Sequence, residues 1–368
     1  MKNIRKFKTA YDMVNAVKYW VNVSYNTETS GLSSIIDYSL IHATFKALGD
    51  GSFSFSKKGD GDDIQYSKDN GYTWTVLPSG ESVSVSYGDK VMWKSTITPK
   101  TGYGMGTFSS TCSFKAFGNV MSLLYGDGFR GQVDLSEKKQ AFCNLFNKCV
   151  NLVDASNLIL PATTLSRNCY SGMFEGCKNL ITAPELPATT LADYCYNNMF
   201  YNCSNLKKSP ELPATTLAPH CYSYMFHMCT KMTEGPSVLP ATTLASGCYV
   251  YMFYQCIKLA KAPSVLPATT LADNCYRGMF YFCTSLTTAP ELPATKLADS
   301  CYYMMLYHCT SLENIKMLAT DVSASECLSF WVAGMPSTGT FVKHPDMDSL
   351  PTGADGIPEG WTVKDAVL

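Results

Sequence analysis

The 368-residue chain has little charge and no excess of either sign. Asp, Glu, Lys and Arg make up 16% of the residues, and the formal net charge is -1. A globular protein usually carries about 25% charged residues, and a nucleic-acid-binding protein displays a basic patch. We therefore expect no nucleic-acid partner.

The chain also lacks long hydrophobic runs. No segment approaches the roughly 18 to 20 consecutive apolar residues that a membrane-spanning helix requires. The basic opening MKNIRKFK is followed by a segment that Asp12, Asn15 and Lys18 interrupt, so no signal-peptide core is evident. We expect no membrane span, and we expect assembly in the cytoplasm before release to a virion or a cell surface.

Motifs of catalysis are missing as well. The histidines stand beside no paired nucleophile and in no metal-ligand spacing; they are His42, His220, His227, His308 and His344. Asp60, Asp62 and Asp63 lack the full set of oxygen ligands of a calcium loop and are interpreted as a solvated turn. The sequence predicts a protein that is not an enzyme and that holds neither a cofactor nor a metal.

Cysteine, in contrast, is abundant, and most of it lies in an internal repeat. From about residue 140 the phrase LPATTLAxxCYxxMFxxCxxL recurs every 26 or 27 residues. Its second cysteine is Cys177, Cys203, Cys229, Cys256, Cys283 and Cys309. Divergent units fit the same pattern at residues 141–149 and 327–335, so the array has six full repeats and two end units.

The spacing of the repeat columns predicts a short helix in each unit. Counted back from the second cysteine, the first cysteine is at position -8, Tyr at -7, Met at -4 and Phe at -3. On a 3.6-residue period these positions form one apolar stripe. Two cysteines eight residues apart on one helix are separated by about 12 Å, too far for a disulfide, so we predict free thiols.

A short strand is expected after each predicted helix, in segments such as LTTAPEL and LKKSPEL. Pro184 and Pro187 stop one such strand from extending. The following LPATT is interpreted as a stacked turn, because no Gly follows it as in the LPxTG anchoring signal. Residues 129–335 are therefore predicted to form an α/β leucine-rich-repeat solenoid of 26–27-residue strand-turn-helix repeats.

The repeated FxxCxxL phrase before a strand resembles the BspA-like bacterial leucine-rich repeat proteins, which are common in Bacteroides. The resemblance covers about residues 140 to 335, and the period is longer than is usual for that group. It implies adhesion to a cell-surface protein or glycan.

The region before the repeats has the alternation of β-strands. Residues 49–128 are predicted to form a small all-β domain, a sandwich or a barrel, in which IQYSKDNGYTWTVL makes a hairpin at Asn70 and Gly71. Residues 1–48 contain a predicted helix over 9–20 and are expected to serve attachment or homo-oligomerisation. The opening IRKF and the later NVSY resemble the N-terminal segments of structural proteins in Bacteroides phages and prophages. The block from Ile64 to Leu124 is similar to modules placed before such repeats. Residues 336–368 are expected to form a C-terminal cap or tail.

One column of the repeats is aromatic although the predicted helix would expose it to solvent. Position -2 holds Glu175, Tyr201, His227, Tyr254, Tyr281 and Tyr307, and neighbouring outward positions hold Tyr224, Tyr251 and Phe282. Exposed aromatic side chains commonly mark contact surfaces. The alternative is that these side chains only pack against one another.

These patterns together favour a non-enzymatic binding or adhesion protein. The first hypothesis is a receptor-binding component of a phage or prophage tail, because a cytoplasmic assembly keeps sixteen thiols reduced. The alternative is a BspA-like adhesin of a bacterial cell surface. A third hypothesis, an enzyme of unrecognised type, requires a deep pocket.

Overall fold

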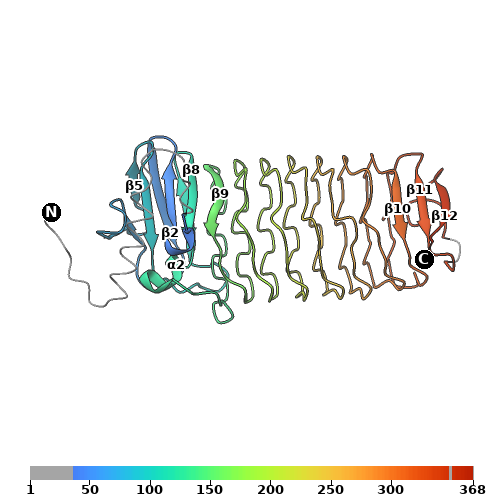
Figure 1. Cartoon of the computed structure of the whole chain (residues 1–368), viewed down its shortest axis with the longest axis horizontal. Coiled ribbons are helices and arrows are strands. Elements are labelled where there is room, and N and C mark those ends of the chain that lie inside the picture. The colour runs from blue at the N-terminus through green and yellow to red at the C-terminus, as the bar shows by residue number, and fades with distance from the viewer. Residues whose placement is uncertain (1–35, 348–349, 368) are drawn as a thin grey trace.

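The computed structural model describes residues 36–347 and 350–367. The molecule is elongated, with sheets at one end, a row of stacked coils in the middle and a small parallel sheet at the other end (Figure 1). The helix predicted over 9–20, and most of the predicted attachment segment 1–48, lie outside the described residues.

The regular elements are short and fall mainly in the first third of the chain. They are η1 (Tyr38–Leu40), β1 (Thr44–Ala47), β2 (Gly51–Lys57), β3 (Gln65–Ser67), β4 (Thr75–Val76), β5 (Ser82–Val85), β6 (Lys90–Lys94), β7 (Gly106–Ser110), β8 (Phe114–Asn119), α2 (Ser122–Tyr125), η2 (Gly126–Gly128), β9 (Leu152–Ile159), β10 (Asn314–Met317), β11 (Thr340–Lys343) and β12 (Thr362–Asp365).

Two sheets pack face to face at the N-terminal end. The larger has the strand order β4-β3-β6-β1-β8-β9, and the smaller has the order β5-β2-β7. Aromatic side chains fill the space between them: the Phe45 ring lies 5.5 Å from that of Phe53 and 4.8 Å from that of Phe108. The predicted hairpin is present as β3 and β4, with Gln65 opposite Val76.

Strand β9 joins these sheets to the coils. It pairs with β8 in parallel, and Asp154 in β9 forms a parallel bridge with Thr182 of the following coil. The larger sheet therefore continues across the boundary that the sequence placed between residues 128 and 129. One hydrophobic core runs from Ala43 through the coils to Trp361.

The predicted helices are absent, and the prediction of an α/β leucine-rich-repeat solenoid with one helix per repeat is wrong. Only 3% of the structure is helical against 24% in strands, and its single α-helix among the described residues is α2, outside the repeats. The segments expected to be helical are chains of turns, and the expected strands are reduced to isolated parallel bridges such as Lys208 with Glu234.

The backbone of these turn segments alternates between two kinds of hydrogen bond. The Phe200 amide donates to the Met225 carbonyl of the next coil over 2.9 Å. Two residues earlier, the Asn198 amide likewise donates to the next coil, to the Ser223 carbonyl. The amides between them close turns onto the carbonyl three residues earlier, as Met199 does onto Tyr196. Both sets of polar groups are thus satisfied without a helix.

Every fourth residue of these segments has a left-handed backbone. In the coil that ends at Cys203 these residues are Tyr194, Asn198 and Asn202, with φ of 57°, 55° and 58°. These residues stand at positions -9, -5 and -1, four residues apart. After every four residues the side chains therefore point in the same direction again. The columns at -8, -7, -4, -3 and 0 therefore all face inward, as a helix of 3.6 residues per turn also nearly achieves.

All sixteen cysteines are free and buried, which confirms the prediction of free thiols. The helix geometry on which that prediction rested is absent. The second cysteine of each repeat donates its thiol hydrogen to the Phe carbonyl of the preceding coil. Cys203 Sγ lies 3.1 Å from the Phe174 oxygen, and Cys229 Sγ lies 3.2 Å from that of Phe200. Burial raises the pKa of the Cys309 thiol to about 12. A small side chain with a weak donor fits this column.

Buried aromatic side chains form two further columns inside the coils. The Phe column stacks with ring centroids 5.3 Å apart between Phe174 and Phe200, and 5.6 Å apart between Phe200 and Phe226. The Tyr column stacks similarly, with 5.8 Å between Tyr196 and Tyr222. Each coil thus buries its rings against its two neighbours, which makes the stability of the stack cooperative.

The C-terminal end of the stack is covered by a sheet in the order β10-β11-β12, in which all pairs are parallel. Among the residues that the structure describes, no helix is long and apolar enough to span a membrane.

Candidate functional site

The sequence-predicted residues at position -2 form one continuous row on the coils, which we call the surface aromatic column: Tyr201, His227, Tyr254, Tyr281 and Tyr307. Successive ring centroids lie 4.8, 4.3, 4.7 and 4.6 Å apart. All five side chains are half-buried. The rings therefore contact one another and also present area to solvent.

The other predicted aromatic residues lie against this column. The Tyr224 ring is 5.9 Å from that of His227 and 5.3 Å from that of Tyr251. The Tyr251 ring in turn is 5.6 Å from that of Tyr254. The structure thus brings all seven predicted binding residues into one cluster.

Glycine in the next coil makes room for one of these rings. Gly278 has φ +59°, and a methyl group built on it would lie 2.2 Å from Cε1 of Tyr251. Gly334 has the same relation to His308, with a built Cβ 2.8 Å from the imidazole. The aromatic side chains at left-handed positions therefore lie flat along the stack.

The cluster extends beyond the residues that the binding prediction named. The Phe282 ring lies 4.9 Å from the Tyr281 ring and 4.9 Å from the His308 ring, and His308 lies 4.5 Å from Tyr307. Both residues occupy position -1; Phe282 was expected among the outward aromatic residues, whereas His308 was not. The adjacent aromatic residues at positions -2 and -1 in the last two repeats are the sequence signal that could have found His308.

Burial shifts the titration of two column members. It lowers the pKa of His227 to about 4, and the imidazole Nδ1 has no hydrogen-bond partner among the described residues. Burial, followed by the neighbouring Tyr307, raises the pKa of Tyr281. Both side chains are therefore uncharged at neutral pH, so the column is an apolar strip edged with hydroxyl groups.

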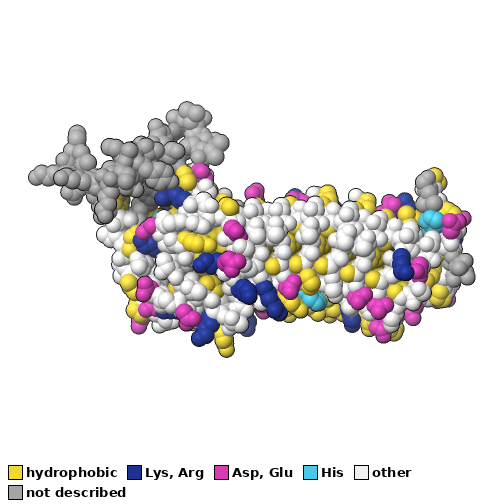
Figure 2. Space-filling model, turned by 90° about the horizontal axis from the view of Figure 1, so that it is seen from below, with side chains coloured by type: hydrophobic (Ala, Val, Ile, Leu, Met, Phe, Trp, Pro, Cys, Tyr) yellow, Lys and Arg dark blue, Asp and Glu magenta, His cyan; other side chains and the backbone are white. Residues whose placement is uncertain are grey.

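Charged side chains are unevenly distributed along the molecule. On the face drawn in Figure 2, hydrophobic side chains run along the coils, and Lys, Asp and Glu side chains are more frequent toward the two ends. Glu175 precedes Tyr201 at position -2, and burial raises the pKa of its carboxyl group. The Arg277 guanidinium lies 4.3 Å from the centroid of the Tyr303 ring.

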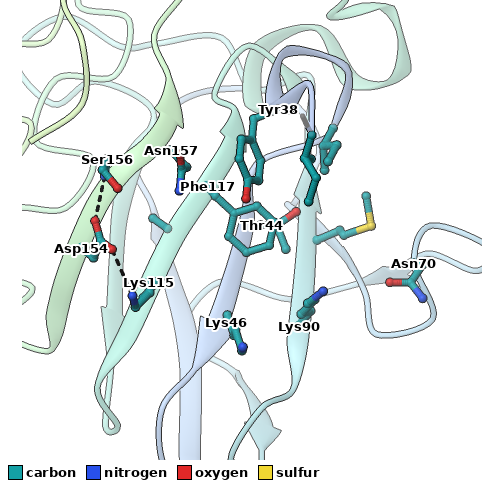
Figure 3. Close-up of a pocket in the computed structure, with 14 residues that line it drawn as sticks. Tyr38, Thr44, Lys46, Asn70, Lys90, Lys115, Phe117, Asp154, Ser156 and Asn157 are labelled. Atoms are coloured by element: carbon teal, nitrogen blue, oxygen red, sulfur yellow. Dashed lines mark hydrogen bonds and ion pairs between the residues drawn. The ribbon is translucent and has the colours of Figure 1, made fainter. Parts of the chain in front are cut away.

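A second candidate surface, which sequence reasoning missed, lies on the outer face of the larger sheet. It is a pocket of about 310 Å³ whose lining includes Lys46, Lys90, Lys115, Phe117 and Tyr38. Figure 3 shows Lys46 and Lys90 side by side below Tyr38 and Phe117. The lysines are far apart in the sequence and are brought together by the pairing of three strands, which no local pattern indicates. We call this surface the lysine pocket.

The remaining titratable groups do not assemble into a metal site. Among the described residues, no group of three or more His, Cys, Asp or Glu side chains is placed to hold a metal ion. Asp63, in the cluster considered for calcium, pairs with Lys57 over 3.3 Å. His42 contacts Asp127 over 3.0 Å, and Lys94 contacts the other oxygen of that carboxylate over 2.7 Å.

Comparison of the chain with family models, with curated proteins and with solved structures found no match. The function is therefore argued from the two surfaces themselves.

Proposed function

We propose that this protein is a non-enzymatic binding protein that recognises a cell-surface glycan or protein through the surface aromatic column. The observation that carries the proposal is the row of five half-buried rings with centroids 4.3 to 4.8 Å apart across successive coils. Rings with hydroxyl groups offer apolar area for stacking and donors for orientation at little cost in side-chain entropy.

The arrangement of the column suits an extended ligand. Its rings repeat along the long axis of the molecule, so a chain of sugar units or an extended peptide meets the same chemistry at each coil. Since contacts between the column rings, two of them stacked and two edge-to-face, already restrict their orientation, little side-chain freedom is lost on binding. The half-buried position of the column rings therefore favours ligand binding as well as packing between the coils.

The proposed place of action is a phage or prophage tail, with the bacterial cell surface as the alternative. Sixteen buried free thiols support assembly in a reducing compartment, where mispairing is avoided. Peptide mass spectrometry of purified virions and of the outer-membrane fraction of the producing cells distinguishes the two locations.

The binding function is tested with the labelled full chain on a panel of Bacteroides cells. We expect saturable attachment to a subset of strains. Loss after periodate treatment of the cells identifies a glycan receptor, and loss after protease treatment identifies a protein receptor. Absence of attachment to every strain, with the folded chain at micromolar concentration, contradicts the proposal.

A further inference from the structure

The lysine pocket places three cations in one row of a sheet. Lys46 in β1 is in register with Lys90 in β6 on one side and with Lys115 in β8 on the other. Like charges directly opposite each other destabilise paired strands. The three side chains are exposed, so solvent screens part of this repulsion, and a bound anion would relieve the rest.

Only one of the three cations has a carboxylate partner among the described residues. Lys115 Nζ lies 3.2 Å from Asp154 Oδ2, as the dashed line in Figure 3 shows. No ion pair is formed by Lys46 or Lys90 with any residue that the structure describes. The lining thus holds three ammonium groups against one carboxylate.

The electrostatic cost of the row is visible at Lys90. Burial lowers the pKa of this ammonium group, and the charge of Lys46 lowers it further. A bound anion would act in the opposite direction on both lysines, because an opposite charge favours the protonated form.

The other walls of the pocket suit a ring that carries hydroxyl groups. Phe117 and Tyr38 form an apolar edge, with ring centroids 5.5 Å apart and an interplanar angle of 69°. Ser156 and Asn157 are exposed on β9 at the pocket margin and offer hydroxyl and amide groups. The volume of about 310 Å³ lies at the lower end of the range of small-molecule sites, about 300 to 1,000 Å³.

We propose that the lysine pocket binds an acidic sugar, with its carboxylate or sulfate between Lys46 and Lys90 and its ring against Phe117 and Tyr38. This site is separate from the surface aromatic column and does not depend on it. It would give the N-terminal sheets a recognition role of their own, since charge-assisted hydrogen bonds orient an anion strongly.

The test uses the full chain and D-glucuronate as the probe, with D-glucose as its neutral match and inorganic sulfate as the bare anion. We expect saturable binding of glucuronate in calorimetric titration, with glucose and sulfate each at least about tenfold weaker. The double variant Lys46→Met, Lys90→Met keeps the aliphatic stems and should weaken glucuronate binding by about tenfold or more.

Two controls make the result specific. Lys58→Met removes an exposed lysine outside the pocket and should leave binding unchanged. The double variant should unfold at the same temperature as the wild type or higher, because it relieves repulsion. Tyr281→Ser should still bind glucuronate, which separates this site from the aromatic column.

Three results would overturn the proposal. Absence of saturable glucuronate binding, or equal binding by the double variant, removes the site. Equal affinity for glucose removes the role of the lysines, and equal affinity for sulfate removes the role of the ring.

Discussion

At the scale of single residues, the half-buried histidine in the surface aromatic column is the most informative. His227 stands where Tyr201 and Tyr254 stand in the neighbouring coils, and its ring lies 4.3 Å from that of Tyr254. Burial lowers its pKa to about 4 from the usual value of 6.5 for histidine. The unfolded chain therefore takes up a proton between these pH values before the folded chain does.

This difference predicts a loss of stability in acid. The free energy of unfolding contributed by His227 is fully present above pH 6.5 and falls as the pH drops toward 4, because only the unfolded state is protonated in that window. His227→Tyr restores the residue of the neighbouring coils and should reduce the difference in unfolding midpoint between pH 7 and pH 4.5. Identical pH dependence in wild type and variant would show that the imidazole is not desolvated.

Glycine at a left-handed position carries a second residue-level prediction. Gly278→Ala combines backbone strain of about 1 to 2 kcal/mol with a clash against the Tyr251 ring. Gly176→Ala is the matched control, since its φ is +72° and a methyl group there meets only Lys148, at 3.3 Å from Cγ and 3.4 Å from Cα, with no overlap like that at Gly278. In urea denaturation Gly278→Ala should cost about 1 kcal/mol more, the contribution of the displaced ring contact. Equal costs would mean that Tyr251 moves aside freely.

At the scale of the element, the sequence predicts the columns of the repeat but not its backbone. Cys203, Phe200 and Met199 face inward as expected. The same inward spacing arises from a 3.6-residue helix and from turns that repeat every four residues, so side-chain burial does not distinguish them. A partial signal for the turns is the Asn or Gly at some of the positions -9, -5 and -1, such as Asn198 and Asn202, which tolerate a left-handed backbone. Other repeats have Tyr, Met or His at these positions, so the signal is too irregular to predict the backbone.

The surface position of the aromatic column does not depend on whether the repeat is a helix or a chain of turns. Position -2 lies outside the inward columns in both geometries, so the rings of the surface aromatic column lie half-buried at the surface although no helix carries them. The lysine pocket is different, because Lys46, Lys90 and Lys115 meet only through strand pairing. Contacts of that kind depend on tertiary register, which local periodicity does not contain.

At the scale of the whole molecule, the stack is expected to be stable only when both ends are covered. The Phe253 amide donates to the Met279 carbonyl of the next coil, and the Phe253 ring lies 5.6 Å from that of Phe280. Truncation after Cys256 removes both partners and exposes the core. We expect the truncated chain to aggregate, as measured by light scattering.

The matched control deletes residues 257–309 and keeps the C-terminal cap. This deletion removes two repeats and joins Cys256 to the residue that follows the equivalent Cys309, so the register of the coils is preserved. We expect this shortened chain to remain soluble and to unfold cooperatively. A soluble, folded truncation without the cap would contradict the dependence of each coil on its neighbour.

The central claim is that the surface aromatic column binds the receptor, and attachment measured beside stability tests it most directly. The variant carries Tyr201, Tyr254, Tyr281 and Tyr307 replaced by Ser. Because each aromatic pair of the column contributes about 0.5 to 1.5 kcal/mol, the variant should also lose stability. Phe226→Leu, in the buried Phe column, lowers stability without changing the surface and is the matched control.

Attachment of both folded variants to receptor-bearing cells is then compared at a temperature below either unfolding transition. The account predicts that the Ser variant no longer attaches and that Phe226→Leu attaches as the wild type does. Wild-type attachment by the Ser variant, or a loss in both variants that follows their loss of stability, would contradict it.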